Sequence, residues 1–262
     1  MKKYFIFSDT HSFFTILKKE LGRKGFDVNN NNHILVLCGD LFDRGNESKE
    51  IYEFIKSFPT ERRILIRGNH EFLFIDALYK DVPDYYDHTN GTVQTLNDLC
   101  DNRYANWSDL VTDKKLAEIK KWILSNEWVD YYETDNYIFT HSFIPLKIDD
   151  LSYSKHMYNV DVNFLSYDAN WRDASHIEFE NATWGCPLKL AKAGLNRTGK
   201  TIVCGHWHTS DFFNNLKNLK VKYNLYDNNP IFISKRYKLI GLDACTAATN
   251  MINVLVLNEN EL

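Results

Sequence analysis

Five apolar segments of the chain end in short polar motifs that are rich in aspartate, histidine and asparagine. In chain order the motifs are SDTH (8–11), GDLFDRG (39–45), RGNHE (67–71), THS (140–142) and GHWH (205–208). Imidazole nitrogens and carboxylate oxygens are donors that suit Mn, Fe and Zn ions. No cysteine belongs to the set, which argues against a structural zinc site. The motifs therefore predict a metal centre with a chemical role.

The donors are too many for one ion, and their spacing divides them between two. Asp9 and His11 lie on a single turn and can reach a first ion. Three further residues can hold a second ion: Asn69, His141 and His206. Asp40 has two carboxylate oxygens, so it can bridge both. Two ions about 3.5–4 Å apart clamp the attacking and leaving oxygens of a phosphoryl displacement and deprotonate a water near neutral pH.

The segments that precede the motifs have the length and composition of buried strands. Tyr4–Phe7, His33–Leu37 and Arg63–Ile66 each run directly into a motif, and helical patterns follow over 13–21 and 46–58. Three strand–loop–helix units in succession indicate an α/β architecture. Ligands of open α/β sheets bind at the carboxyl ends of the strands, which is where the motifs lie.

The rest of the chain continues the mixed pattern. Residues 71–126 have a mainly helical pattern, with Asp113 as the expected N-cap of KKLAEIKKWIL. A hairpin is expected around 135–136 and a helix over 188–193, and strands are predicted at 137–140, 202–204, 231–233, 237–242 and 252–257. There is no repeat and no linker rich in Gly, Pro or Ser. We expect one domain, residues 1–262, with a mainly helical insertion around 71–130.

Composition limits the class of protein. The chain has 262 residues, 44% of them hydrophobic and 25% charged, so it can bury a sizeable core. Its net charge is −4 and it has no basic stripe, so nucleic-acid binding is not expected. None of the five cysteines forms a C-x-x-C pair, which favours reduced, buried thiols. No segment has the length of a membrane span or a signal sequence, and we expect a cytoplasmic protein without membrane contact.

As an ordered set, the five motifs resemble those of the calcineurin-like metallophosphoesterases. GDLFDRG, RGNHE and the closing segment IGLDACTAATNMINVLVL (240–257) are most similar to the bacterial and phage serine/threonine protein phosphatase branch. One Asp-x-His is common by chance, whereas five motifs in order over 8–257 are specific. The resemblance implies a two-layer β-sandwich of mixed sheets flanked by α-helices, in four layers (α/β-β/α). It also implies that a metal-bridging hydroxide attacks phosphorus directly.

The resemblance also implies a role for each motif residue. It assigns Asp9 and His11 to the first metal, Asp40 to the bridge, and Asn69, His141 and His206 to the second metal. His70 would be the general acid for the leaving group, and Asp43 would orient it and favour its charged form. Arg44 would bind phosphate oxygens with its planar guanidinium group, with Asn69 as a second substrate-binding residue.

The chain departs from the protein phosphatase pattern in three places. Ser12 stands where a glycine usually permits a tight turn, which puts the shape of that loop in question. The stretch NATWGCP (181–187) lacks the second phosphate-binding arginine, for which Arg172 and Arg197 are the nearest candidates. His208 gives the Gly-His-x-His pattern of the wider superfamily. We therefore expect His208 to complete the shell of the first metal beside Asp9, His11 and Asp40.

Several residues beside the motifs have structural explanations. Arg67 is expected to form an ion pair, and Glu71 is expected to accept backbone hydrogen bonds at a helix start. Trp184 and Trp207 either line the pocket or pack in the core.

Three functions are compatible with this sequence. The first is a metal-dependent phosphoesterase that hydrolyses phosphomonoesters of proteins. The second keeps the chemistry but acts on nucleotides, as a dinucleoside polyphosphate hydrolase or a phosphodiesterase. The third is a non-catalytic scaffold, which the complete set of ligands and the acid His70 disfavour. The expected cofactors are two divalent ions, with Mn²⁺ favoured and Fe or Zn as alternatives, and the expected partner is a phosphorylated protein or a nucleotide.

Overall fold

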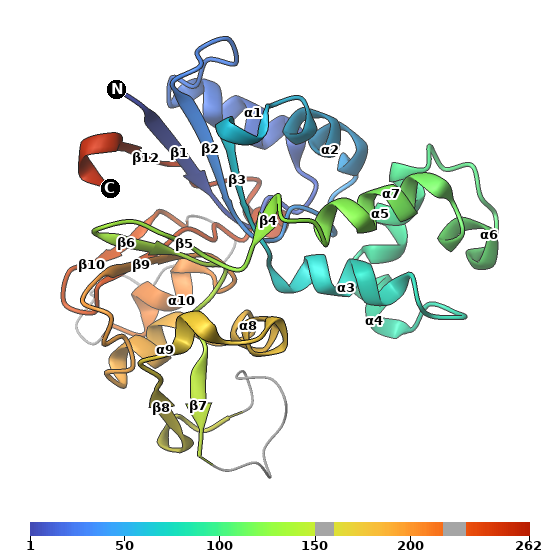
Figure 1. The fold of residues 1–262 in the computed structure, drawn as a ribbon. Helices are drawn as coiled ribbons and strands as arrows, with labels where there is room; N and C mark the ends of the chain where they lie inside the picture. Colours follow the sequence, from blue (N-terminus) through green and yellow to red (C-terminus); the bar gives the residue numbers. More distant parts are fainter. Residues whose placement is uncertain (150–159, 217–228) are drawn as a thin grey trace.

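Two five-stranded sheets form the centre of the molecule, which a computed structural model describes for residues 1–149, 160–216 and 229–262 (Figure 1). The order in the first sheet is β12 (Leu255–Asn258), β1 (Lys3–Phe7), β2 (His33–Cys38), β3 (Arg63–Ile66) and β4 (Trp128–Val129). The order in the second sheet is β10 (Phe232–Ser234), β11 (Leu239–Gly241), β9 (Thr201–Cys204), β6 (Tyr137–Phe139) and β5 (Tyr132–Glu133). Both sheets are mixed, with parallel inner strands and an antiparallel strand on at least one edge.

The inner strands are apolar on both faces because both faces are covered. Successive side chains of a strand point to opposite faces. In β1, Phe5 and Phe7 pack against the helices, whereas Tyr4 and Ile6 pack between the two sheets. In β9, Val203 joins the same layer between the sheets, and its neighbours face the second group of helices. The predicted four-layer fold, a two-layer sandwich of mixed sheets flanked by helices, is confirmed.

Seven helices belong to the half of the chain that builds the first sheet. They are α1 (Phe14–Arg23), α2 (Ser48–Lys56), α3 (Asn69–Ala77), α4 (Tyr85–Thr89), α5 (Thr92–Leu99), α6 (Trp107–Val111) and α7 (Lys114–Ile123). The segment between β3 and β4 forms α3 to α7 and projects to one side of the sandwich (Figure 1). As predicted, the Asp113 carboxylate caps α7 by accepting a hydrogen bond from the Lys115 backbone N–H, at 2.6 Å.

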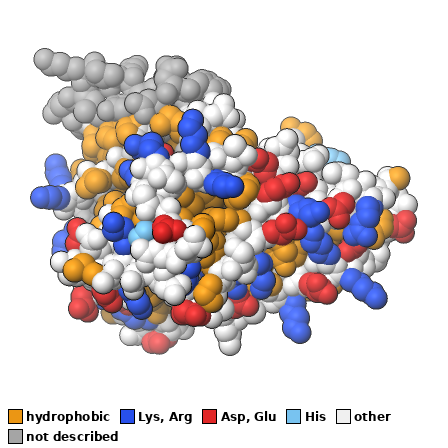
Figure 2. All heavy atoms as spheres, turned by 90° about the horizontal axis from the view of Figure 1, so that it is seen from above, with side chains coloured by type: hydrophobic (Ala, Val, Ile, Leu, Met, Phe, Trp, Pro, Cys, Tyr) orange, Lys and Arg blue, Asp and Glu red, His pale blue; other side chains and the backbone are white. Residues whose placement is uncertain are grey.

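In the described residues, four short helices and a hairpin accompany the second sheet. The helices are α8 (His176–Ala182), α9 (Pro187–Lys192), α10 (Thr209–Asn214) and α11 (Thr246–Thr249), and the hairpin pairs β7 (Leu146–Ile148) with β8 (Leu165–Tyr167). Within the described ranges, no helix has the length and apolar character needed to cross a membrane. On the face shown in Figure 2, basic and acidic side chains of the described residues are interspersed, without a continuous basic stripe.

The predicted strands agree with the structure at the motifs and differ elsewhere. The strand predicted over 252–257 begins only at Leu255. The Asn253 side chain donates hydrogen bonds to the backbone oxygens of Asn229 and Leu242, at 2.7 and 2.9 Å, and this holds the preceding residues out of the ladder. The prediction also lacks β4, β7 and β8, which have only two or three residues each.

Candidate metal centre

Three of the polar motifs, SDTH, GDLFDRG and GHWH, turn sharply where their strands end. The residues with a positive φ at these ends, between 47° and 75°, are Asp9, His11, Ser12, Asp40, Asp43, Arg44 and His206. This left-handed backbone costs a non-glycine residue roughly 1–2 kcal/mol. Hydrogen bonds between the first two loops hold it in place: the Asp9 N–H donates to the Gly39 oxygen at 3.1 Å, and the His11 N–H donates to the Asp40 oxygen at 3.1 Å. The site is therefore shaped by the backbone as well as by its side chains.

Ser12 adopts a left-handed backbone conformation, which glycine adopts most readily. Its φ is 58°, its N–H donates to the Leu41 oxygen at 2.9 Å, and its hydroxyl accepts a hydrogen bond from the Ser48 hydroxyl at 2.9 Å. The loop therefore makes a tight turn. The hydrogen bond to the Ser12 hydroxyl, which a glycine could not form, offsets part of the backbone strain.

Glu71 connects the second and third loops. Its buried carboxylate accepts hydrogen bonds from the backbone N–H groups of Gly68 at 2.7 Å, and of Asp40 and Leu41 at 2.9 Å each. The predicted role at a helix start is confirmed and extends to the neighbouring loop. Arg67 forms the predicted ion pair, with Asp130 at 2.9 Å. Glu71 and Arg67 therefore stabilise the loops that carry the predicted ligands.

Four potential ligands of the second ion meet at His141. The Nε2 atom of this ring lies 2.8 Å from Asn69 Oδ1, 3.2 Å from His206 Nδ1 and 3.4 Å from Asp40 Oδ1. The opposite nitrogen, Nδ1, donates to the Cys38 backbone oxygen at 2.9 Å, so in the neutral ring Nε2 carries a lone pair. Donors that lie about 2.1 Å from one ion are roughly 3 Å apart. The distances from His141 Nε2 to the other three donors are therefore those of ligands that share one ion.

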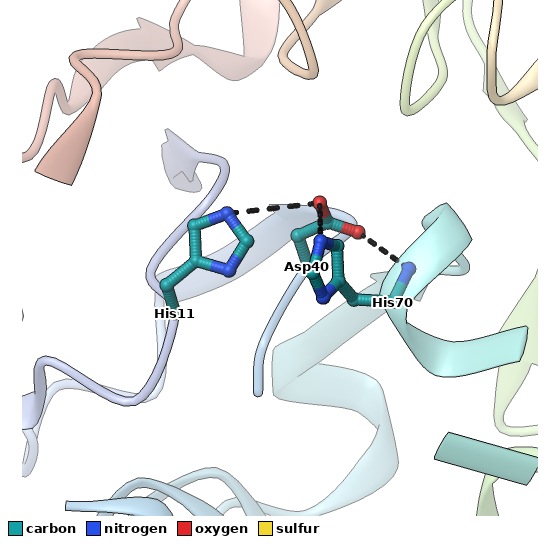
Figure 3. Close-up of side chains that lie close together, drawn as sticks. All are labelled: His11, Asp40 and His70. Atoms are coloured by element: carbon teal, nitrogen blue, oxygen red, sulfur yellow. Dashed lines mark hydrogen bonds and ion pairs between the residues drawn. The ribbon is translucent and has the colours of Figure 1, made fainter. Parts of the chain in front are cut away.

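The residues predicted for the first ion lie on the other side of Asp40. His11 Nδ1 contacts the Phe42 backbone oxygen at 3.0 Å, which leaves Nε2 facing the site. This Nε2 is 3.9 Å from Asp9 Oδ1 and 3.8 Å from Asp40 Oδ2. Figure 3 shows the imidazoles of His11 and His70 directed at the same Asp40 carboxylate. Asp40 thus lies between the two groups of donors.

Burial sets the charge state of these groups. It lowers the pKa of His11 and His206 well below the ordinary value and lowers the pKa of His141 to about 3, so these rings stay neutral near pH 7. Burial also raises the pKa of Asp9, with Asp243 as the next cause, and of Asp40, with Asp9 as the next cause. Neutral imidazoles beside several buried carboxylates are a donor set that fits divalent ions.

The His70 ring is in hydrogen-bond contact with the Asp43 carboxylate. Its Nδ1 lies 2.7 Å from Asp43 Oδ2, which also accepts a hydrogen bond from the Thr92 hydroxyl at 2.9 Å. The Asp43 N–H donates to the Thr95 hydroxyl at 3.0 Å. Both threonines belong to α5, and they were not predictable because no local sequence pattern links α5 to the second loop. Arg44 Nη2 is 3.4 Å from His70 Nε2.

A cavity of about 140 Å³ opens over these side chains, and a second depression of about 400 Å³ adjoins it. The cavity is lined by residues from every motif except THS, namely Asp9, His11, Asp40, Arg44, Asn69, His70, His206 and His208. Asp243, which lies outside the five motifs, lines it as well. His208 is at the rim, with its Nε2 3.8 Å from Asp243 Oδ2. Its ligation of the first ion stays a prediction.

Neither candidate for a second phosphate-binding arginine reaches the cavity. Arg172 pairs with both carboxylate oxygens of Glu133, at 2.6 and 2.7 Å, and its guanidinium lies over the Trp171 ring. Arg197 donates to the Gly194 backbone oxygen at 3.3 Å. Among the described residues that line the cavity, Arg44 is the one with a fixed positive charge.

The close approach of Gly205 to the first loop gives a testable prediction. A Cβ atom at Gly205 would lie 1.9 Å from both Asp9 Oδ2 and Ser8 Oγ, so Gly205→Ala must displace the Asp9 carboxylate. We expect this variant to lower the free energy of unfolding by roughly 1–3 kcal/mol, the usual cost of overpacking, in urea titrations of the metal-free protein.

Gly22→Ala is the matched control. Gly22 lies in α1, and a Cβ atom there would have no heavy atom within 4 Å. Alanine is expected to stabilise the helix by roughly 0.5–1 kcal/mol. Equal unfolding free energies for the two variants would contradict the close packing of Gly205 against Asp9.

Comparison with known sequences shows the family to which this chain belongs. The sequence profile described as calcineurin-like phosphoesterase matches residues 2–210. A segment of 82 residues is 37% identical to a symmetrical bis(5'-nucleosyl)-tetraphosphatase of Buchnera aphidicola subsp. Baizongia pistaciae. That match spans 31% of this chain and 28% of the length of the Buchnera protein.

Comparison with solved structures gives the same fold at low sequence identity. A cold-active protein-tyrosine phosphatase of a psychrophilic Shewanella species has a TM-score of 0.59 and 16% identity, covering 99% of this chain and 76% of that one. A protein serine/threonine phosphatase from Saccharomyces cerevisiae has a TM-score of 0.51 and 15% identity, covering 92% and 66%. At these identities the likeness concerns the fold.

Proposed function

The chain belongs to the calcineurin-like phosphoesterase family, and from this premise we propose that it is a metal-dependent phosphatase that hydrolyses phosphomonoesters. The observation that carries the proposal is the convergence of Asn69, His141, His206 and Asp40 donors beside a histidine that a carboxylate orients. A scaffold protein would have no need for a neutral imidazole cluster and an oriented acid in one cavity.

The side chains divide into those that hold ions and those that handle the substrate. We assign Asp9 and His11 to a first ion and Asn69, His141 and His206 to a second, with Asp40 shared between them. Two divalent ions bound there would supply a nucleophile from water at neutral pH and neutralise charge on the phosphate. We propose Mn²⁺, with Fe and Zn as alternatives, because the set contains nitrogen and oxygen donors and no thiolate.

His70 is placed to donate a proton to the leaving group. Its Nδ1–H points to Asp43, which fixes the ring and leaves Nε2 facing the cavity. A proton on Nε2 can pass to the leaving oxygen as the bond to phosphorus breaks. Positioned acids of this kind contribute about 10²–10⁴-fold to rates.

Arg44 binds the phosphate next to His70. Its side chain lines the cavity within 3.4 Å of His70 Nε2, so a phosphate oxygen bound to the guanidinium lies beside the proton donor. Asn69 turns its Oδ1 to His141, and we assign the nitrogen of the same amide to a phosphate oxygen. With one arginine on the cavity wall, the described residues hold the phosphate less firmly than two arginines would.

A second candidate function, hydrolysis of nucleotides, is favoured by the depression beside the cavity. Trp184 and Trp207 line this depression together with Arg44, and both rings lie edge-on to His206, with centroids 5.9 and 6.5 Å from it. Stacking of a base on an aromatic side chain contributes roughly 1–3 kcal/mol. The Buchnera relative and one structural neighbour carry nucleotide substrates in their names, the latter as a diadenosine tetraphosphatase, whereas two other structural neighbours are protein phosphatases.

Substrate comparison with a Trp207→Leu variant tests these alternatives. We expect the Mn²⁺-loaded protein to hydrolyse p-nitrophenyl phosphate, and inactivity on every phosphoester tried would overturn the proposed function. If nucleotides are the substrates, Trp207→Leu lowers kcat/KM for diadenosine tetraphosphate by roughly 5- to 150-fold relative to phosphoserine. A ratio that does not change, together with faster hydrolysis of phosphopeptides, would support the protein phosphatase assignment.

A further inference from the structure

Asp243 is a buried carboxylate that follows the end of β11. It has 3% of its surface exposed and lines the same cavity as Asp9, His11 and Asp40. Strand β11 lies beside β9 and parallel to it, so its carboxyl end reaches the edge of the sheet from which the GHWH motif emerges. Asp243 therefore occupies the position in β11 that the metal motifs occupy in the other strands.

Hydrogen bonds from three segments fix the backbone around Asp243. Its Oδ1 accepts from the Cys245 N–H at 2.7 Å, and its backbone oxygen accepts from the Thr209 N–H at 3.0 Å. The hydroxyl of Thr246 donates to the Asp9 backbone oxygen at 2.8 Å. One carboxylate oxygen is thus used in the turn, and the turn is attached both to the first loop and to the start of α10.

The other oxygen, Oδ2, faces His208 at a distance that is too long for a hydrogen bond. It is 3.8 Å from His208 Nε2, whereas His208 Nδ1 is 3.9 Å from Asp211 Oδ2 on the opposite side of the ring. Donor atoms that share one ion lie roughly 3–4 Å apart. The distance alone does not set Asp243 apart from Asp211; what does is that Asp243 is buried and lines the cavity together with the donors predicted for the first ion.

The negative charges around Asp243 would also be stabilised by a bound cation. Three buried carboxylates, those of Asp9, Asp40 and Asp243, line one cavity, and Arg44 is the fixed positive charge among the described residues on its wall. Buried carboxylates are stable when they are paired or bind a metal. A single arginine with an exposed side chain does not balance three of them.

We propose that Asp243 is a further ligand in the site of the first ion, contributing Oδ2 beside the Nε2 of His208. This assignment rests on the proposed metal-dependent function and gives the first ion two donors from the second sheet. Asp9, His11 and Asp40 complete the set from the first sheet.

Manganese binding to an Asp243→Asn variant tests the assignment. Asparagine keeps the side-chain volume and an oxygen acceptor for the Cys245 N–H, and it removes the charge. Equilibrium dialysis of the full chain against Mn²⁺ is expected to give two sites in the natural protein. In the variant we expect one site to be unchanged and the other to weaken at least 10-fold, and the electron paramagnetic resonance signal of a coupled Mn²⁺ pair to disappear at two equivalents.

Asp211→Asn is the matched control, because it removes a carboxylate from the exposed side of the same histidine. It should keep both sites within about threefold of their natural affinities. Two unchanged sites in Asp243→Asn would overturn the proposal. So would a melting temperature of the metal-free Asp243→Asn protein clearly below that of the natural protein, since this would assign Asp243 to folding alone. A natural protein that binds two Mn²⁺ but hydrolyses no phosphoester would contradict the proposed function and leave the Asp243 assignment standing.

Discussion

Asp40→Asn is expected to lower phosphatase activity by roughly 10³-fold or more. The two oxygens of Asp40 face different donors: Oδ1 is 3.4 Å from His141 Nε2, and Oδ2 is 3.8 Å from His11 Nε2. Asparagine offers one oxygen and no charge, so it cannot serve both groups. Metal ions supply several kcal/mol of charge stabilisation in such reactions, and each 1.4 kcal/mol corresponds to a tenfold change in rate.

The measurement combines kcat/KM for p-nitrophenyl phosphate with metal content per chain. Both should fall together in Asp40→Asn, because the oxygen that remains can still accept the His70 backbone N–H, which donates to Oδ1 at 3.0 Å, and the loop should stay folded. Asp135→Asn, in the exposed turn between β5 and β6, is the control and should match the natural protein. Full activity of Asp40→Asn with two bound ions would refute the bridging role.

His70→Ala is expected to lower kcat by about 10²–10⁴-fold while both ions remain bound. The reason is the loss of the proton donor, since His70 reaches the cavity through Nε2 and is held by Asp43 through Nδ1. The loss should be smaller for p-nitrophenyl phosphate than for phosphoserine, because the nitrophenolate departs without a proton. Steady-state kinetics on both substrates, with metal analysis of the same samples, measures the effect.

Metal content separates this role from a rival one. His70 Nε2 is also 3.9 Å from Asp40 Oδ2, so His11, Asp40 and His70 together have the spacing of a metal site. If His70 were a ligand, His70→Ala would lose an ion along with activity. Asp43→Asn is the informative partner: it keeps the shape of the loop, and it should lower kcat without changing metal content. Unchanged kcat in both variants would exclude the acid assignment.

The strands and the residues at their ends were predictable because the signals are local. Apolar runs such as Arg63–Ile66 fix where a strand begins and ends, and the residue types that follow indicate the chemistry. Parallel strands then bring their carboxyl ends to one edge, so Asp9, Asp40 and Asn69 had to approach one another. No contact had to be known in advance for this step.

Contacts between segments without a shared local pattern were not predictable. Thr92 meets Asp43 across 49 positions of sequence, and its helix looks like any other amphipathic helix. Asp243 ends a strand as the motif residues do, but one aspartate without a neighbouring histidine gives no signal of its own. The Ser12 loop shows the converse: the residue type suggested a different turn, and hydrogen bonds from neighbouring loops impose the glycine-like conformation.

The division of the donors between the two sheets affects how the protein unfolds. Asp9, His11, Asp40 and Asn69 follow strands of the first sheet, whereas His141 and His206 follow strands of the second. A bound ion shared by both sets is therefore a cross-link between the layers, comparable to a disulfide that can be removed with a chelator. With it in place, neither sheet can detach at this edge alone, and the sandwich should unfold as one cooperative unit. Without it, amide hydrogen exchange should accelerate first at the carboxyl ends of β2, β6 and β9.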